Sequence, residues 1–562
     1  MTDFPWVKNY PKNIPAEIGA MEYESLVEMF EKSIQANADK VAYENMGKTI
    51  TYREVDELSR QFAAYLQDKL QMKKGDTIAL QMPNLLQYPV ALIGALRAGL
   101  IVVNTNPLYT PREMEHQFND AGVKAVVIVA NFASNLEKII KNTSIQHVIV
   151  TELGDMLGGL KGTIVNFVVK HIKKMVPSYS LPKAISFKKA LKDGASSQFN
   201  KPVIKAEDLA FLQYTGGTTG VSKGAQLSHK NIVAHTMQIK YWFGPLLEEG
   251  MTETMITAIP LYHIFALSVN GIFMFRIGAK NILITNPRDM PGFVKELKKQ
   301  KFTLFTGVNT LFNGLLNQPD FKEVDFSSVK VAIGGGMAVQ DAVAKKWQQV
   351  TGGALVEGYG LSETSPVLSV NPLDGTHRLG TIGLPVPSTE MALFDEEGNK
   401  LPQGEVGEIC ARGPQVMSGY WKREADNDKV FFEGGWFRTG DIGQMDADGF
   451  FKIVDRKKDM INVSGFNVYP NEIENVVAGH PKVLEVAAIG VPDPRSNEAV
   501  KIFVVKSDES LTKEELDAYC DENLTGYKTP KHIEFMDTLP KSNVGKILRR
   551  ELREREDASA SS

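Results

Sequence analysis

Apolar runs that predict buried strands alternate with helical patterns through most of the chain. Such runs lie at residues 77–81, 125–129, 147–150, 209–213 and 329–333. Thr51 and Glu54 have the spacing of a capping box, and the helix that they open has apolar positions at Val55, Leu58, Phe62 and Tyr65. Strands and helices in alternation are typical of sheets covered by helices on both faces. We therefore predict an α/β fold for the large N-terminal part.

The pattern changes twice towards the C-terminus. Residues 380–458 form short alternating runs broken by Asp/Gly turns, which predicts a small β-rich subdomain. A polar, basic junction follows, and then a βαβ-like tail with strands at 486–491 and 501–505 and a capped helix from Thr512. We place the domain boundary near residue 456, which gives an N-terminal domain of residues 1–455 and a C-terminal domain of residues 456–562.

One apolar stretch has nearly the length of a membrane span. Residues 261–279 are interrupted by the polar side chains of His263, Asn270 and Arg276, so we interpret the stretch as a buried helix. The N-terminus has no basic segment followed by an apolar one, and therefore no secretory signal is expected. A cytoplasmic protein is predicted.

Residues 161–176 combine basic and apolar positions. Lys170, Lys173 and Lys174 are interleaved with the apolar residues Ile164, Phe167, Val168, Ile172 and Met175. Helices that lie on a membrane surface have this pattern, although a solvated helix face explains such a run more often. Peripheral contact with the cytoplasmic face of the membrane is a hypothesis.

The charge balance and the cysteine count argue against several classes of function. Among 562 residues, 63 Lys and Arg nearly balance 67 Asp and Glu, for a net charge of −4. A protein that grips a nucleic-acid backbone usually carries a basic field, so nucleic acid is not an expected partner. Only two cysteines occur, which gives neither a disulfide framework nor a metal cluster and fits a reducing compartment.

A loop rich in glycine and threonine directly follows the predicted strand at 209–213. Glycines let backbone N–H groups converge on an anion, while hydroxyls and a lysine add further donors. The loop is not a Walker A element, because Lys223 is followed by Gly224. By itself the loop is as often only a turn. The candidate phosphate-binding residues are Thr215, Gly216, Gly217, Thr218, Thr219, Gly220 and Lys223.

A second motif, EGYGLSE, occupies residues 357–363. It places the ring of Tyr359, which could stack on a purine, close to the carboxylate of Glu363, which could bind a divalent cation. The alternative is a glycine turn with a solvated glutamate. Glu357, Gly358 and Ser362 complete the candidate nucleotide-binding residues of this motif.

Three further residues are candidates from regions closer to the C-terminus. Asp441 is a short acceptor suited to the hydroxyls of a ribose, and Arg456 is a planar donor suited to the sugar or a phosphate. Lys546 follows a flexible Ser-Asn-Val-Gly segment, so its ammonium could enter a site built elsewhere. Each of these residues alone would more often be an ordinary surface charge.

In this order the motifs resemble the acyl-adenylate-forming superfamily, which includes acyl-CoA synthetases, luciferases and peptide-synthetase adenylation domains. Within it, the chain is most similar to bacterial long-chain fatty acyl-CoA synthetases. The resemblance covers nearly the whole sequence, through stretches such as FPWVKNYP, NPLYTPRE, PLYHIFAL, GFNVYPNEIE and LTGYKTPK. It implies a large N-terminal domain of two α/β sheet subdomains and a small β-barrel-like subdomain, followed by a small mobile α+β domain.

The resemblance also implies roles for individual residues. The loop from Thr215 would hold the ATP phosphates, and Thr215 and Glu363 would bind Mg²⁺. Gly336, Gly358 and Tyr359 would line the adenine pocket. The family usually has threonine where Ser362 stands, but a hydroxyl remains.

Further roles follow for the C-terminal part. Asp441 and Arg456 would hold the ribose, and Lys458 would lie at the interdomain hinge. Lys546 would act in the adenylation step, together with Thr215 and Glu363. The region around Gly465 would meet the pantetheine arm of coenzyme A.

The predicted reaction converts a long-chain fatty acid, ATP and coenzyme A to acyl-CoA, AMP and diphosphate, for fatty acid degradation or lipid synthesis. Alternatives are a ligase for medium-chain or aryl acids, or a non-catalytic fatty-acid binding or uptake protein. His263 could take part in catalysis or be a core histidine. The apolar segments 261–275 and 307–316 could line an acyl tunnel or be plain core. The resemblance also suggests a homodimer.

Overall fold

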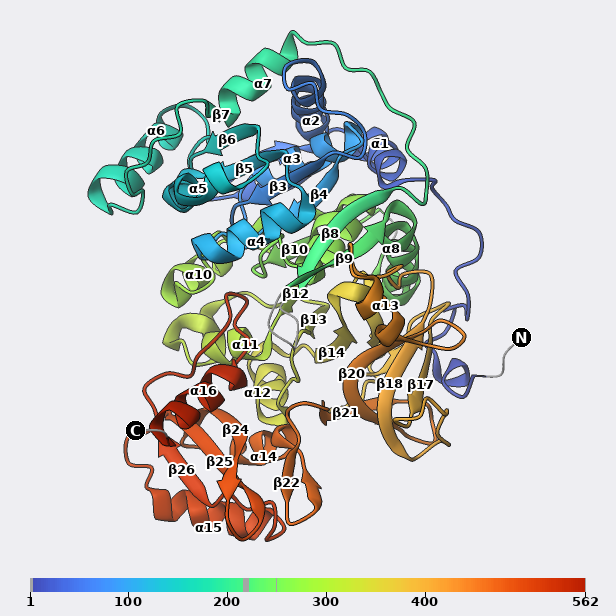
Figure 1. Cartoon of the computed structure of the whole chain (residues 1–562), viewed down its shortest axis with the longest axis vertical. Helices are drawn as coiled ribbons and strands as arrows, with labels where there is room; N and C mark the ends of the chain where they lie inside the picture. Colours follow the sequence, from blue (N-terminus) through green and yellow to red (C-terminus); the bar gives the residue numbers. More distant parts are fainter. Residues whose placement is uncertain (1–3, 216–221, 249, 561–562) are drawn as a thin grey trace.

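The computed structural model describes residues 4–215, 222–248 and 250–560. A large N-terminal domain carries the first 21 strands, and a small C-terminal domain begins at β22 and lies below it in Figure 1. The predicted α/β architecture with a small C-terminal domain is confirmed. The proposed boundary at residues 455/456 falls at the end of β21 (Phe451–Arg456).

The first sheet of the N-terminal domain has seven strands. All neighbours are parallel except the last pair, which is antiparallel. The side chains of one strand alternate between two apolar clusters, one beneath α2, α3 and α7 and the other beneath α4 and α5. In order, the strands are β7 (Ile185–Ser186), β6 (His147–Thr151), β5 (Ala125–Val129), β3 (Thr77–Gln81), β4 (Ile101–Asn104), β8 (Leu209–Thr215) and β9 (Lys223–Ser228).

The second sheet has nine strands, and its central strands are parallel. One face packs on α10, α11 and α12, and the other shares the main core with α8 and the buried helix after residue 265. In order, the strands are β16 (Leu384–Pro385), β15 (Val367–Val370), β14 (Leu355–Gly360), β13 (Val331–Gly334), β12 (Leu304–Gly307), β10 (Thr254–Thr257), β11 (Lys280–Leu283), β1 (Val41–Asn45) and β2 (Lys48–Thr51).

The predicted β-rich subdomain is an antiparallel sheet of five strands. It lies beside the nine-stranded sheet and to the right of the C-terminal domain in Figure 1. Its longest strand, β20, pairs with three others and carries Asp441. The strands are β17 (Glu390–Phe394), β18 (Val406–Arg412), β20 (Trp436–Met445), β19 (Phe431–Phe432) and β21.

The C-terminal domain is built on a second five-stranded sheet. β24 and β25 form a long antiparallel hairpin, so the two predicted strands of the tail are neighbours without a helix between them. The βαβ unit lies one step later, where β25, α15 and the parallel strand β26 follow each other. The strands are β22 (Ile461–Val463), β23 (Phe466–Val468), β24 (Val483–Asp493), β25 (Asn497–Lys506) and β26 (His532–Phe535).

Several helices begin at a residue whose side chain caps them. Thr51 and Thr110 form capping boxes at α2 and α4, and Thr512 caps α15, as predicted for the first and the third of these. The helices are α1 (Leu26–Asn37), α2 (Tyr52–Asp68), α3 (Gln87–Arg97), α4 (Pro111–Ala121), α5 (Ala133–Ile139), α6 (Gly159–Phe167), α7 (Phe187–Ala195), α8 (His229–Phe243), α9 (Met274–Arg276), α10 (Met290–Leu297), α11 (Asn309–Leu316), α12 (Asp341–Thr351), α13 (Glu424–Val430), α14 (Pro470–Val477), α15 (Lys513–Asn523) and α16 (Arg549–Ala560).

The apolar stretch 261–279 is buried, as predicted. It contains a π-helix over Ala266–Phe273 that continues into α9. The amide of Asn270 bonds the hydroxyls of Thr257 and Thr306, and the Arg276 guanidinium bonds the hydroxyl of Thr236, which satisfies these polar groups inside the core. Within the described residues, no helix is long and apolar enough to cross a membrane.

Candidate active site

A cavity lies where the nine-stranded sheet, α8 and the C-terminal domain meet, with about 740 Å³ of space that no protein atom fills, including solvent at its opening. One wall is polar and glycine-rich and comes from the ends of β13 and β14. The other wall is apolar and comes from α8, the buried helix and β15. Lys546 is the lining residue that the C-terminal domain contributes.

Backbone conformation keeps the glycine-rich wall open. Gly336, after β13, has a φ of +78°, and a Cβ there would lie 3.1 Å from Cε of Lys546. Glycine is favoured at such a position both because of its φ and because the lysine stem passes so close. Gly358 and Tyr359 line the same wall from β14. The resemblance assigned these three residues to a nucleotide, and each lies at least 187 positions before Lys546 in the chain. They nevertheless line one cavity together with Lys546.

Asp441 lies on β20 behind Tyr359 and is 5% exposed. Its carboxylate accepts a hydrogen bond of 2.7 Å from the Tyr359 hydroxyl, and Nε of Arg456 lies 3.3 Å from its other oxygen. Asp441 and Arg456 are register partners on β20 and β21. This pairing gives a fixed acceptor and a partly exposed donor side by side, which suits the hydroxyls of a sugar.

Glu363 lies in a short 3₁₀ turn, Ser362–Thr364, after β14. Its carboxylate is 6% exposed and accepts a hydrogen bond of 2.6 Å from the hydroxyl of Tyr420. Burial raises the pKa of Glu363 above its ordinary value. A cation beside the group would reverse that effect, because opposite charge favours the ionised form. Tyr420 was not singled out in the sequence, where an isolated tyrosine carries no signal of its partner.

The two ends of the predicted phosphate loop lie next to each other. Thr215 ends β8 and Lys223 begins β9, and the two are register partners. The Lys223 ammonium pairs with Asp426 at 2.8 Å and lies over the ring of Tyr420. The β8–β9 hairpin is thus tied to the partner of Glu363. The predicted residues Gly216, Gly217, Thr218, Thr219 and Gly220 lie outside the described residues.

Lys546 is carried by a tight hairpin of the C-terminal domain. Lys541 and Ile547 form a β-bridge, and Ser542 exchanges hydrogen bonds with both backbone groups of Lys546, one of them through its hydroxyl. Burial, and next the charge of Arg456, lower the pKa of Lys546 to about 8. The ammonium therefore lies in surroundings that favour the arrival of a negative charge.

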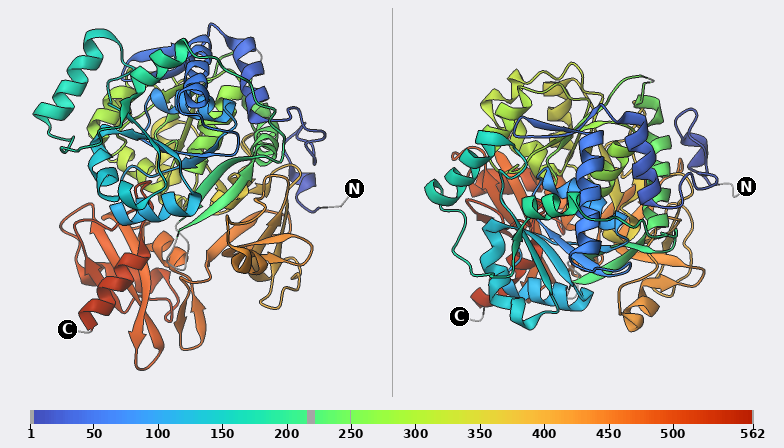
Figure 2. Two further views of the ribbon diagram at one scale, coloured as in Figure 1. Left: turned by 45° about the horizontal axis from the view of Figure 1, so that its top comes forward. Right: turned by 90° about the horizontal axis from the view of Figure 1, so that it is seen from above.

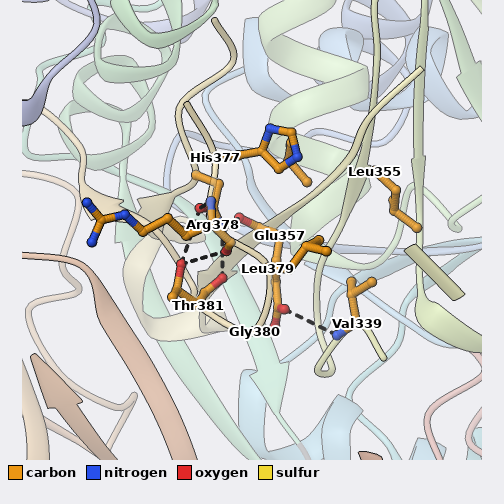
Figure 3. A pocket seen from close by; sticks show the side chains of 10 residues that line it. Val339, Leu355, Glu357, His377, Arg378, Leu379, Gly380 and Thr381 are labelled. Atoms are coloured by element: carbon orange, nitrogen blue, oxygen red, sulfur yellow. Dashed lines mark hydrogen bonds between the residues drawn. The ribbon is translucent and has the colours of Figure 1, made fainter. Parts of the chain in front are cut away.

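Glu357 faces a different space from its neighbours Gly358 and Tyr359. It lines a small pocket of about 220 Å³ beside His377 and Arg378 (Figure 3). One carboxylate oxygen accepts a hydrogen bond of 3.3 Å from the Val339 backbone, and burial raises the pKa of the group to about 8. Residues of this one motif therefore line two pockets.

Lys458 and Gly465 are exposed and do not line the cavity. Lys458 is exposed in the turn after β21. Gly465 is exposed at the tip of the β22–β23 hairpin, with a φ of +87°. Ser362, by contrast, lines the cavity.

The apolar wall includes a helix that sequence reasoning did not assign to the site. Ile239, Trp242 and Phe243 of α8 line the cavity and are each at most 3% exposed. Their helical spacing was visible in the sequence, but it is also the pattern of ordinary core. Segment 261–275 contributes to the wall, whereas apolar residues of 307–316 belong to the core around Trp347.

His263 lines the cavity with Lys546. Its Nδ1 accepts a hydrogen bond of 3.3 Å from the backbone N–H of Phe265, and burial lowers the pKa of the ring to about 3. The imidazole is therefore neutral at physiological pH, with its backbone-facing nitrogen already occupied.

Sequence comparison shows the family to which the protein belongs. Residues 30–421 match the AMP-binding enzyme family, and residues 472–546 match the AMP-binding enzyme C-terminal domain. The chain belongs to the AMP-binding enzyme family. The predicted resemblance is thereby confirmed, and the two matched regions contain the two groups of residues that meet in the cavity.

Named members of the AMP-binding family extend the comparison. The chain is 60% identical to the long-chain-fatty-acid–CoA ligase of Escherichia coli O6:H1 and 54% identical to that of Haemophilus influenzae, in both cases over 98% of each chain. A solved structure, the anthranilate CoA ligase AuaEII in complex with anthranoyl-AMP, superposes with a TM-score of 0.83 at 25% identity, over 97% of this chain and 99% of that one.

Proposed function

We propose that the protein is a long-chain-fatty-acid–CoA ligase that activates its substrate as an acyl-adenylate and then transfers the acyl group to coenzyme A. One observation carries the proposal: a single cavity joins an apolar wall from α8 to a polar wall with Asp441 behind it, and Lys546 of the C-terminal domain lines the same cavity. Relatives that match 98% of the chain at 54 to 60% identity bear the same name.

The apolar wall suits the aliphatic chain of the substrate. Each buried methylene contributes about 0.8 kcal/mol, so a long chain gains more from Trp242, Phe243 and Val269 than a short one. An aryl acid would fill less of this wall. The long-chain reading is favoured over the medium-chain and aryl alternatives for this reason.

The chemistry needs charge stabilisation more than a protein nucleophile. A carboxylate oxygen attacks the α-phosphorus of ATP, the bond to pyrophosphate breaks, and a mixed anhydride with AMP forms. The thiolate of coenzyme A then attacks the acyl carbon and AMP leaves. Lys546 would hold the charge that develops around the α-phosphate, and Asp441 with Arg456 would fix the ribose. Tyr359, Gly336 and Gly358 would enclose the base.

Glu363 and Thr215 offer the kind of donors that fit a magnesium ion. Mg²⁺ in nucleotide sites commonly has one or two protein oxygens, phosphate oxygens and water as ligands. The buried carboxylate of Glu363 and the hydroxyl of Thr215 are such donors, and their elements, the 3₁₀ turn and β8, pack together. The ion would draw charge from the phosphates and make pyrophosphate a better leaving group.

A change of domain orientation would let one adenylate serve both half-reactions. Lys546 lines the cavity, whereas Gly465 is exposed at the tip of the β22–β23 hairpin of the same domain. If both serve one substrate, the C-terminal domain must turn between the two steps, with the hinge near Lys458 after the boundary at 455/456.

The release of products tests this function. With oleate, ATP, Mg²⁺ and coenzyme A, the purified protein is expected to form AMP, pyrophosphate and oleoyl-CoA in equal amounts. Octanoate and benzoate should react much more slowly. Tight oleate binding without AMP release would instead indicate a binding or uptake protein, and faster turnover of benzoate would indicate an aryl ligase.

We also propose that residues 161–176, together with the start of α6 before them, contact the cytoplasmic face of an anionic membrane. This segment, α6 with the π-helix Val168–Ile172, projects from the periphery of the N-terminal domain (Figures 1 and 2). Its inner side is held by close packing of Gly162 on Gly154 and by Asn166. Five large apolar side chains are at least half exposed: Leu160, Ile164, Phe167, Ile172 and Met175.

Three lysines of the same segment, Lys170, Lys173 and Lys174, complement anionic headgroups, and a substrate dissolved in the membrane gives the contact a purpose. Changing all three to Glu is expected to abolish co-flotation with vesicles of phosphatidylglycerol and phosphatidylethanolamine. A matched control changes the exposed lysines Lys12, Lys322 and Lys345 to Glu. Equal loss in both variants, or loss in neither, would contradict the proposal.

The predicted homodimer forms the last part of the proposal. It rests on the family resemblance, and sedimentation equilibrium of the purified protein tests it: a mass near twice 62.1 kDa is expected, and a single protomer mass would exclude it.

A further inference from the structure

One face of α11 holds the lysine-bearing hairpin over the cavity. The Thr310 hydroxyl donates a hydrogen bond of 2.8 Å to the carbonyl of Gly545, the residue directly before Lys546. One turn further along the same face, the Asn313 amide donates a hydrogen bond of 2.7 Å to the carbonyl of Leu484 on β24. Two donors of the N-terminal domain thus meet two backbone acceptors of the C-terminal domain.

Packing around Gly545 makes this contact specific. Gly545 has a φ of +85°, and a Cβ on it would lie 2.8 Å from the Thr310 hydroxyl and 3.2 Å from a methyl group of Val308. Only a residue without a side chain brings the carbonyl this close to α11 without a collision. Because Ser542 bonds both backbone groups of Lys546, the hairpin tip moves as a unit, and fixing Gly545 also fixes the origin of the lysine side chain.

Few other polar contacts join the hairpin to the N-terminal domain. Among the described residues, the remaining side-chain hydrogen bond to the hairpin tip is the exposed one of 3.1 Å from Arg288 to Asn543. An exposed hydrogen bond competes with water and contributes little, whereas that of Thr310 is partly buried. The position of Lys546 therefore depends strongly on one hydroxyl.

We propose that Thr310, supported by Asn313, is a positioning residue that selects the domain orientation for adenylation and has no part in thioester formation. The inference rests on the proposed role of Lys546. It predicts a division between the half-reactions: Thr310 matters while Lys546 must lie in the cavity, and its hydroxyl becomes irrelevant once the C-terminal domain turns.

Thr310→Val removes the hydroxyl and keeps the shape of the side chain. We expect about a fivefold loss in oleate-dependent exchange between pyrophosphate and ATP, as for one lost hydrogen bond. Formation of oleoyl-CoA from preformed oleoyl-adenylate should stay unchanged, which also shows that the variant is folded. Thr310→Ser should restore the exchange. The control Thr351→Val removes a hydroxyl that bonds only within its own helix and the following turn, and should change neither step.

A double variant separates positioning through Lys546 from a general structural effect. If Thr310 acts through Lys546, Thr310→Val adds no further loss to the exchange activity of Lys546→Ala. Losses that multiply, an equal loss in both half-reactions, or no loss in the single variant would each overturn the inference. If Lys546→Ala itself lowers both half-reactions equally, the proposed role of Lys546 fails, and that result is distinct from the failure of Thr310 alone.

Discussion

The two domains that meet at the cavity support their residues in different ways. Gly336, Tyr359 and Glu363 belong to the N-terminal domain, whose main apolar cluster runs from the seven-stranded sheet through α8 to the small β sheet. The hairpin of Lys546 belongs to a domain whose two apolar clusters contain C-terminal residues alone. The residues of the N-terminal domain are fixed by a continuous core, whereas the hairpin of Lys546 is held over them by surface contacts.

This difference explains how one site could serve two steps. Moving a site residue of the N-terminal domain would disrupt close packing, whereas withdrawing Lys546 needs only polar contacts of the kind made by Thr310 to break. The groups that would hold the nucleotide therefore stay in place in both steps, whereas Lys546, which would act in one step, can leave the cavity. Four experiments sharpen or break this comparison.

The largest effect is expected for Lys546→Ala. Loss of the ammonium removes charge stabilisation at the α-phosphate, and adenylation should fall roughly hundredfold to thousandfold. Thioester formation from preformed adenylate should change little. Lys541→Ala is the control, because Lys541 lies in the same hairpin but pairs with Glu485 of its own domain. A similar loss in both half-reactions would show that the lysine is not specific to one step.

Glu363→Gln tests the part of the site that belongs to the N-terminal domain. The amide keeps the hydrogen-bonding shape but not the charge, so adenylation should fall about tenfold to hundredfold and need more Mg²⁺ for half-maximal rate. Glu408→Gln is a control of equal burial, since both residues are 6% exposed and Glu408 pairs with Arg438 away from the cavity. An unchanged Mg²⁺ dependence would exclude Glu363 as a magnesium ligand.

Gly336→Ala tests the contact between the N-terminal domain and the Lys546 side chain. The added methyl group would lie 3.1 Å from Cε of Lys546, and we expect about a tenfold loss of adenylation with little change in thioester formation. Gly352→Ala provides the matched control. Its φ of +74° is similar to that of Gly336, but open space surrounds it. Equal losses in the two variants would mean that backbone strain, and not the lysine, is responsible.

The smallest effect concerns pH. Burial and Arg456 lower the pKa of Lys546 to about 8, so the protonated form that adenylation requires is lost as pH rises through that value. The kcat/KM for adenylation should fall about twofold from pH 7 to pH 8 and continue downwards. Lys546→Arg should remove this decline. If the decline persists, Glu357, whose pKa burial also raises to about 8, becomes the candidate for it.

Local structure followed closely from the sequence pattern. The runs at 77–81 and 125–129 became β3 and β5 with the predicted bounds, and Thr51 caps α2. Apolar periodicity and capping act over a few residues, so they can be recognised without knowledge of the fold. Strand pairing was harder to predict from the sequence. Both β24 and β25 were predicted as strands, but their pairing in one antiparallel hairpin was not.

The sequence by itself determined the family, the α/β class, the buried helix after residue 265 and the motifs that contain Glu363 and Lys546, and the family resemblance added Gly336. Only the tertiary structure decided that Trp242 lines the cavity, that Tyr420 bonds Glu363, and that Thr310 meets Gly545 across 235 positions of the chain. The reason is physical. A side-chain pattern encodes whether a residue prefers burial, but its partner depends on how separately formed sheets and domains pack against each other.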